Sequence, residues 1–503
     1  MNDQNLQPYG DYPPEKLECV TFPTGKKEVL FAGLIAIASL ALCNFIMEGG
    51  FALGFALAAI GSIVCSAVYL LTSGCKPTAY SVSLLALSCV IAAGYARSDD
   101  AFVKFVMVFF LFFSINLGLC LLAGNNRRNP GGIRSLLDAL RAVFALGVGK
   151  LPESCRGLGQ AFRKSGSVGQ KGGAFLLGLG IAIPVLAVMI PLLISADAAF
   201  DGLIALLPDF EIGELIRTVL FGVLLAFWLY TRGVALRHSK KKAAKEKTKK
   251  GVSPITVNTA LSTVCGLYVV YLISQLAYFS GGFSGILPEG YTMAEYARRG
   301  FFEMAWLCAI DLGIIAFGAG LVRGTEKKPL STRLLCLFIG VVTLFFVATA
   351  SAKMFLYIDS YGLTRLRVLT QIVMLFLALV TALVMVWLFV PKLPYMKTVL
   401  LAGLLIGAAT LWIDVDTQVA RYNVDAYLSG KLETVDVRYI RQLGSGAVEQ
   451  LHRLTEGAQD EAVREKAQDY LLTYSLQRGA DFRGWNYADH SAAQYLPTIK
   501  DEQ

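Results

Sequence analysis

The sequence has few of the side chains that enzymes commonly use for metal or nucleophilic chemistry. Its 503 residues include only three histidines, His238, His452 and His490, and its ten cysteines form no Cys-x-x-Cys pair. An imidazole-rich metal site, a zinc site or a disulfide framework is therefore not expected. Phosphate-binding loops, His-Glu-x-x-His pairs and Gly-x-Ser-x-Gly turns are absent as well. We expect no cofactor and no metal, and the sequence singles out no catalytic residue.

Charge is also scarce. Charged residues make up 17% of the chain and hydrophobic residues 55%, whereas soluble domains carry roughly 25% charged residues. Many apolar runs reach the roughly 20 residues that a helix needs to cross a bilayer. The sequence therefore predicts an all-α, polytopic helical membrane protein. About eleven transmembrane helices are expected, over residues 28–47, 51–72, 79–96, 101–123, 173–194, 213–235, 255–279, 301–322, 333–357, 367–390 and 396–414.

Basic and acidic residues alternate between the loops that join these spans. Basic residues collect in 124–172, in the Lys240–Lys250 run and in two later loops, while the opposite loops carry Glu48, Asp99 and Asp100. By the positive-inside rule, the N-terminus is cytoplasmic and the C-terminus extracytoplasmic. The Lys240–Lys250 run is expected to attract anionic lipids of the bilayer. It has no interleaved aromatic residues, so nucleic-acid binding is not expected.

The same pattern divides the chain into five parts. They are a disordered cytoplasmic leader (1–27), a four-helix membrane segment (28–123), a basic cytoplasmic loop (124–172), a seven-helix membrane domain (173–416) and an extracytoplasmic helical tail (417–503). Apolar residues recur at helical spacing in Ile133–Val148, which predicts a helix lying in the membrane interface. Ala199–Leu207 looks like a shorter counterpart. In the tail, helices are expected over 435–443, 448–454 and 461–476.

Ionisable residues in or beside the last four spans form the candidate polar site. A charge at mid-bilayer costs about 2.5–3.5 kcal/mol, so each such residue requires a partner or a function. The candidates are two residues within the spans, one near the start of a span and three arginines at the outer mouth: Asp311, Lys353, Glu303, Arg298, Arg365 and Arg367. They form either an outward-facing cavity that binds an anionic group or an interhelical network in which Lys353 pairs with Glu303 or Asp311.

Several short motifs resemble a bacterial membrane family. They are Ser195-Ala196-Asp197, Tyr296-Ala297-Arg298-Arg299-Gly300-Phe301-Phe302-Glu303, Tyr361-Gly362-Leu363-Thr364 followed by Arg367, Asn423, and Asp481-Phe482-Arg483-Gly484-Trp485-Asn486. Their order is similar to that in the domain of unknown function DUF4173, which is related to DUF4153. The resemblance covers the chain from about the fifth span onward. It implies a multi-pass protein of the bacterial plasma membrane and supplies no activity or catalytic residue.

Three functions fit these observations. The first is a transporter-like or lipid-handling protein with an outward-facing polar site. The second is a non-catalytic envelope sensor or assembly partner that acts through the C-terminal tail. The third is a membrane-embedded transferase, which requires paired carboxylates such as Asp414 and Asp416. On a continuous helix these two point about 200° apart, so the third function is disfavoured unless the helix ends there.

Overall fold

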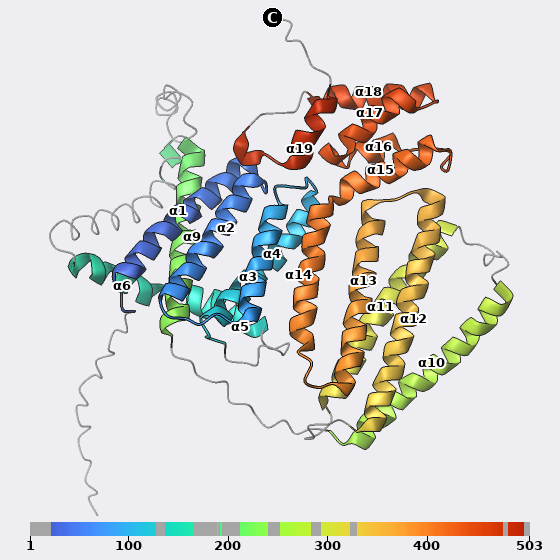
Figure 1. The fold of residues 1–503 in the computed structure, drawn as a ribbon, viewed down its shortest axis with the longest axis horizontal. Helices are drawn as coiled ribbons and strands as arrows, with labels where there is room; N and C mark the ends of the chain where they lie inside the picture. Colours follow the sequence, from blue (N-terminus) through green and yellow to red (C-terminus); the bar gives the residue numbers. More distant parts are fainter. Residues whose placement is uncertain are drawn as a thin grey trace, which may run out of the picture.

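The computed structural model describes residues 22–126, 136–164, 212–239, 252–282, 293–321, 329–475 and 481–496, together with 189, 192 and 193. In 162–164, 212–216, 275–282, 293–300, 320–321 and 475, only the backbone is described. All regular structure in these ranges is helical. The helices form two membrane bundles, beneath a cap made by the C-terminal part of the chain (Figure 1).

The first bundle contains the N-terminal helices and α9. Its members are α1 (Lys26–Gly49), α2 (Leu53–Thr72), α3 (Ala79–Gly94), α4 (Ala101–Leu122) and α9 (Ile212–His238). One core joins α1, α2, α4 and α9 around Phe31, Tyr69 and Leu236, and a second core joins α2, α3 and α4 to α14. α9, which follows the others by about ninety residues in the sequence, packs along α1 and closes this bundle (Figure 1).

Three short helices cover one end of the first bundle. They are α5 (Leu136–Arg141), the π-helix η2 (Ala142–Val148) and α6 (Leu151–Lys164). Leu140, Phe144 and Val148 are exposed along α5 and η2, while Asp138 is buried against the bundle. Most of the segment Ile133–Val148 is therefore helical, with Leu140, Phe144 and Val148 on its outward face and Val143 and Leu146 packed on the bundle. An outward apolar face is what an interfacial helix requires.

The second bundle contains α10 (Pro254–Gly282), α11 (Met293–Leu321), α12 (Leu330–Tyr361) and α13 (Arg365–Phe389). Its core runs along α11 and α12 and includes residues of α10 and α13. α10 leans away from α11 and α12 toward its C-terminal end (Figure 1). α14 (Tyr395–Ile413) lies between the bundles, since it packs on α13 on one side and on α3 and α4 on the other.

The cap has its own core of small and aliphatic side chains. Its elements are α15 (Val415–Leu428), α16 (Val437–Arg441), η3 (Gly444–Ala447), α17 (Val448–Gly457), α18 (Glu461–Ser475), η4 (Phe482–Gly484), α19 (Tyr487–Ala492) and η5 (Ala493–Tyr495). The helices expected over 435–443, 448–454 and 461–476 correspond to α16, α17 and α18. The bundle ends beneath these elements are called the cap end, and the opposite ends the basic end.

Nine of the described helices are long and apolar enough to cross a membrane, which confirms the polytopic, all-helical fold. α3, with 16 residues, is a shorter apolar helix. Large apolar side chains such as Phe105, Trp306 and Phe317 point outward from these helices. Lipid is a suitable solvent for such a surface, whereas water is not. The predicted span 173–194 lies outside the described residues apart from Met189, Leu192 and Leu193, and so do Ala199–Leu207 and the Lys240–Lys250 run.

Candidate functional site

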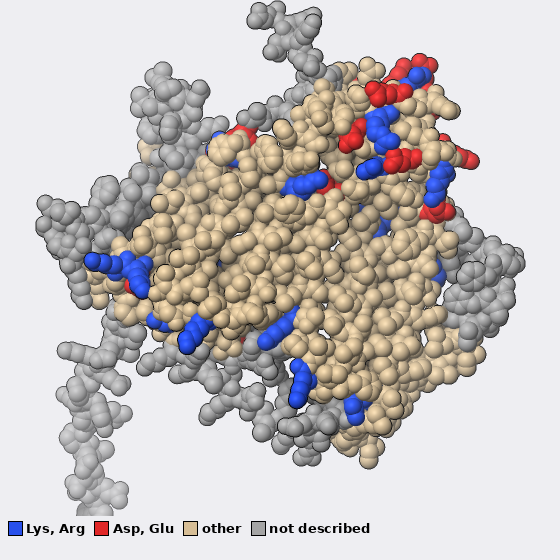
Figure 2. Space-filling view, in the orientation of Figure 1, with Lys and Arg blue, Asp and Glu red and all other residues tan. Residues whose placement is uncertain are grey.

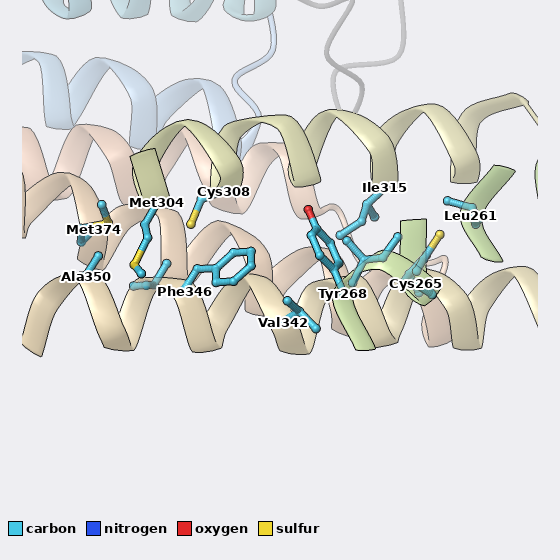
Figure 3. Close-up of a cluster of buried hydrophobic side chains, with 14 of the residues drawn as sticks. Leu261, Cys265, Tyr268, Met304, Cys308, Ile315, Val342, Phe346, Ala350 and Met374 are labelled. Carbon is cyan, nitrogen blue, oxygen red and sulfur yellow. The ribbon is translucent and has the colours of Figure 1, made fainter. Parts of the chain in front are cut away.

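Asp311 is the most deeply placed charge of the predicted site. It lies on α11, is fully buried, and accepts hydrogen bonds from the hydroxyl of Tyr268 on α10 and from Thr343 Oγ1 on α12, the latter at 2.9 Å. Figure 3 shows the Tyr268 hydroxyl directed toward α11, between Cys308 and Ile315. Within the described part of the chain, two hydroxyls rather than a basic group therefore satisfy the Asp311 carboxylate. One acidic side chain joins three helices.

An apolar groove lies beside Asp311, on the surface between α10 and α11. Its volume is about 380 Å³, within the range of small-molecule sites. It is lined only by apolar side chains and glycines: Val257, Ala260, Leu261, Val264, Ile310, Gly313, Ile314, Phe317 and Gly318. Ile310 and Phe317 are exposed, so the groove opens laterally, where lipid surrounds the helices. At Gly313 an added Cβ would meet no other atom within 4 Å.

Glu303 and Lys353 lie farther toward the cap end than Asp311. Lys353 follows Thr343 by ten residues on α12, a rise of about 15 Å, and Glu303 precedes Asp311 by eight residues on α11, a rise of about 12 Å. Both take part in polar or electrostatic interactions. The structure thus places Glu303 and Lys353 at similar depth and separates both from Asp311. The side chain of Arg298 lies outside the described residues.

Arg365, the first residue of α13, binds two buried carboxylates. Its Nε and Nη2 donate to Oδ1 and Oδ2 of Asp416 at 2.6 and 2.5 Å. Its Nε also lies 3.2 Å from Oδ2 of Asp100. The backbone N–H of Arg365 donates to the Tyr439 hydroxyl at 2.7 Å. Because Asp100 precedes α4 and Asp416 and Tyr439 lie in the cap, one arginine connects both bundles to the cap. We call Asp100, Arg365, Asp414 and Asp416 the cap junction.

The chain interrupts its helix at Asp414, between α14 and α15. Asp414 has a φ of 58°, the only positive φ of a non-glycine residue in the described ranges. Its carboxylate accepts hydrogen bonds from Ser98 at 3.2 Å and from Thr417 at 2.8 Å. Because the helix ends here, the objection that Asp414 and Asp416 point apart on one helix does not apply. Both carboxylates are only 2% exposed, however, so a substrate has no access to them as a catalytic pair.

Burial shifts the acidity of the cap junction. It raises the pKa of Asp416 to about 6; Arg365 opposes this shift, and the charges of Asp100 and Asp414 add to it. Burial also raises the pKa of Asp414 and of Asp99, which lies beside the junction. Part of the junction therefore takes up protons in mildly acidic solution. Among the described residues, no group of three or more His, Cys, Asp or Glu side chains is arranged to hold a metal ion.

Arg367 closes the C-terminal end of α12. Its Nη1 donates to the carbonyl oxygens of Tyr361, at 3.1 Å, and of Gly362. Its guanidinium carbon lies 3.9 Å from the centre of the Tyr357 ring. Arg365 and Arg367 are thus both used in contacts that fix helix ends.

Sequence reasoning treated Asp100 as a sign of topology and missed its place in the cap junction. Asp100 is the N-cap of α4, where its Oδ1 accepts hydrogen bonds from the backbone N–H groups of Phe102 and Val103 at 2.9 and 3.0 Å. The available signal was an aspartate directly before an apolar run, which is typical of an N-cap fixed at the membrane boundary.

The sequence motifs resemble DUF4173, whereas the family comparison assigns the chain to the related family DUF4153. The model for the domain of unknown function DUF4153 matches residues 34–454. The match begins inside α1, so it covers most of the first span and all of the next three, and it ends in α17, before the Asp481–Asn486 motif. No curated protein and no solved structure matches the chain. Because the match covers most of its length, the chain belongs to the DUF4153 family of multi-pass membrane proteins with no assigned function.

Proposed function

We propose that this protein is a transporter-like or lipid-handling membrane protein that binds an apolar chain in the groove between α10 and α11. The observation that carries the proposal is the groove itself, an apolar hollow open to lipid with the buried Asp311 behind it. Intramembrane acids that lack a basic partner commonly mark pathways for ions, protons or substrates. In this proposal Glu303, Lys353 and Arg298 continue the site toward the outer face.

Neighbouring residues of α11 face different surroundings, which supports the proposed binding of an apolar chain. Ile310 and Gly313 face the groove, whereas Asp311 points inward to Tyr268 and Thr343. An apolar chain in the groove therefore lies against the same helix, α11, that carries the Asp311 carboxylate. Ligand binding and protonation are coupled if the chain displaces α10, which carries the Tyr268 hydroxyl.

We also infer that the basic end faces the cytoplasm of a bacterial cell and that the cap lies outside the plasma membrane. Lys26, Lys76, Arg333 and Lys397 are at or near helix ends of the basic end. Figure 2 shows blue groups along that edge, mostly without red ones, and a mixture of both around the cap. This distribution supports the orientation expected from the positive-inside rule. Anionic lipids at the Lys240–Lys250 run remain part of this proposal.

The groove is tested by filling it. Gly313→Leu places a large side chain in open space within the groove. Gly266→Leu is the matched control, because Gly266 also has no atom within 4 Å of an added Cβ but does not line the groove. The full chain, reconstituted with a phospholipid whose acyl chain carries a photoreactive diazirine, should be labelled at Val264 and Phe317.

Labelling at these residues should be lost in Gly313→Leu and kept in Gly266→Leu. Labelling that is equal in both variants would show that no chain enters the groove. Asp311→Asn supplies the functional readout in a deletion strain: normal complementation by this variant, at normal protein level, would remove the carboxylate from the proposal.

A role as an envelope sensor or assembly partner is the second candidate, and exposed aromatic groups on the cap favour it. Phe482, Trp485 and Tyr487 are exposed although they lie in a docked segment. Truncating the cap is a poor test, because it would leave Arg365 without Asp416. Phe482→Ser with Tyr487→Ser should instead abolish co-purification of a partner while the cap stays folded. Unchanged co-purification would count against this function.

A further inference from the structure

Arg232 is a buried cation in the first bundle, and among the described residues no acidic side chain balances its charge. It lies on α9 and is 3% exposed. Its Nη1 donates to Asn116 Oδ1 at 3.0 Å, and its guanidinium carbon lies 4.9 Å from the centre of the Trp228 ring. Its Nε is buried and has no hydrogen-bond partner. Among the described residues, no carboxylate lies within ion-pair distance of Arg232.

The cation lies within the span but near the basic end. Arg232 precedes the end of α9 at His238 by six residues, a rise of about 9 Å. Asn116 likewise precedes the end of α4 at Leu122 by six residues. A charge at this depth is close to the headgroups of one leaflet. Phe112 and Trp228 stack beside this region with their ring centres 5.9 Å apart, and Phe112 is exposed.

An unpaired cation in hydrocarbon is costly, and the usual remedy is an anionic partner with directed hydrogen bonds. The neighbouring groups that the structure describes do not supply one. Asn116 is neutral, and its amide nitrogen already donates to the Phe112 carbonyl at 2.7 Å. The guanidinium is a planar fork, and its Nε edge suits two oxygens of one phosphate or carboxylate. In Arg232 the Nε–H on this edge of the guanidinium has no hydrogen-bond acceptor.

We propose that Arg232 anchors an oxyanion site in the first bundle, occupied by the phosphate or carboxylate of a lipid headgroup or by a free anion that enters from the basic end. Asn116 positions the guanidinium through Nη1 and leaves the Nε edge for the ligand. The ring of Trp228 packs against the guanidinium of Arg232. This site is separate from the groove between α10 and α11 and does not depend on the function proposed for it.

The test compares the stabilisation that anions give to wild type and to Arg232→Gln. The full chain is placed in nanodiscs of phosphatidylcholine alone or with phosphatidylglycerol, and its Tm is measured. Phosphatidylglycerol should raise the Tm of wild type but not that of Arg232→Gln. The control is Lys76→Gln, which removes an exposed positive charge at the same end and should keep the wild-type response.

A second arm separates the two sources of the anion. Inorganic phosphate is added to phosphatidylcholine nanodiscs, against chloride at equal ionic strength. Stabilisation by phosphate supports a free anion, and stabilisation by phosphatidylglycerol alone supports a headgroup. Equal responses of wild type and Arg232→Gln in both arms would overturn the site.

Arg232→Gln should fold, because it removes an unbalanced buried charge. If it does not, native mass spectrometry of Arg232→Lys decides the question. Lysine keeps the charge but loses the fork. Retention of phosphatidylglycerol should therefore fall roughly ten- to a hundredfold, the range expected for charge-assisted hydrogen bonds. Retention equal to wild type would again overturn the proposal.

Discussion

Replacing Arg365 by glutamine should destabilise this protein much more than replacing Asp416 by asparagine. In wild type, Arg365 contacts Asp416 through two hydrogen bonds and Asp100 through an ion pair. Arg365→Gln leaves Asp416 without its hydrogen-bonded cation and Asp100 without its ion pair, while both carboxylates stay buried. Asp416→Asn removes one carboxylate and leaves Arg365 with Asp100.

The structure gives the size of each effect. Removing one member of a buried ion pair typically costs about 3–5 kcal/mol, and this is the expected loss for Arg365→Gln. For Asp416→Asn a second contribution opposes the loss. The rise in the pKa of Asp416 from 3.8 to about 6 means that its charged form costs about 3 kcal/mol in the folded state. Asparagine avoids that cost, so the net loss should be about 0–2 kcal/mol.

The pH dependence follows from the same shift. The raised pKa means that the folded state binds a proton at Asp416 before the unfolded state does. The stability that this proton contributes is complete below the unfolded pKa of 3.8 and is lost as the pH rises through about 6. Wild type should therefore gain stability relative to Asp416→Asn as the pH falls from 7 to about 4. In Arg365→Gln the pKa of Asp416 rises further, because Arg365 no longer opposes the shift. As the pH falls, the loss of stability of Arg365→Gln relative to wild type should therefore begin to shrink above pH 6.

Thermal unfolding of the purified chain in detergent, measured across this pH range, provides the assay. Arg438→Gln is the control, because Arg438 is an exposed arginine of the same cap and should change stability by less than about 0.5 kcal/mol. The reasoning would be refuted by equal losses for Arg365→Gln and Asp416→Asn, or by a difference between them that does not depend on pH.

Two further substitutions test how the cap is attached. Asn423→Ala removes hydrogen bonds of 2.7 Å to both the N–H and the carbonyl of Leu363, and it should lower thermal stability by about 2–4 kcal/mol; a loss below 1 kcal/mol would show that water replaces the amide. Gly49→Ala places a Cβ 2.4 Å from the backbone carbon of Arg483, and it should displace η4 and expose the cap to limited proteolysis. Gly61→Ala, on α2 with no atom within 4 Å of the new Cβ, should leave proteolysis unchanged.

The membrane fold follows from sequence because hydrocarbon imposes a simple demand. A run of about 20 apolar residues must satisfy its own backbone hydrogen bonds, and a helix is the form that does so. The predicted span 101–123 thus corresponds to α4, and 367–390 corresponds to α13, within two residues at each end. α2 and α3 are each two residues shorter than their predicted ranges of 51–72 and 79–96, and α3 gives way to a turn after Gly94.

The candidate site was less accessible to sequence reasoning, because position along a span gives depth but not direction around the helix. Asp311 and Lys353 both lie in spans, yet about 15 Å of helix rise separates Lys353 from the level of Asp311. The groups that satisfy Asp311 are the hydroxyls of Tyr268 and Thr343, and nothing in the sequence distinguishes them from other hydroxyls in the spans. The break at Asp414 was equally hidden, since a left-handed conformation is expected at glycine rather than at aspartate.

Arg232 illustrates the opposite case, in which the signal was present and was overlooked. It lies inside the predicted span 213–235, where any basic residue requires a partner. The predicted polar site lies instead in the last four spans, where several charges occur together. Arg232 lies 15 residues from Arg217, the nearest other charge in 213–235. Such an isolated charge is the stronger anomaly, because clustered charges can neutralise one another, as Arg365 and Asp416 do.

The cap joins the two bundles through separate contacts, and both α15 and α19 contribute to its core. At the first bundle, the N–H of Leu53 donates to the Trp485 carbonyl at 3.0 Å, and Arg483 pairs with Glu48 at 2.9 Å. At the second, Asn423 holds Leu363. Both attachments belong to a cap with a common core, so displacing η4 by Gly49→Ala should also speed hydrogen exchange at Leu363. Hydrogen exchange that changes only around η4 would mean that the cap attaches to each bundle independently. In that case, protonation at the cap junction would have no route to the first bundle through α19.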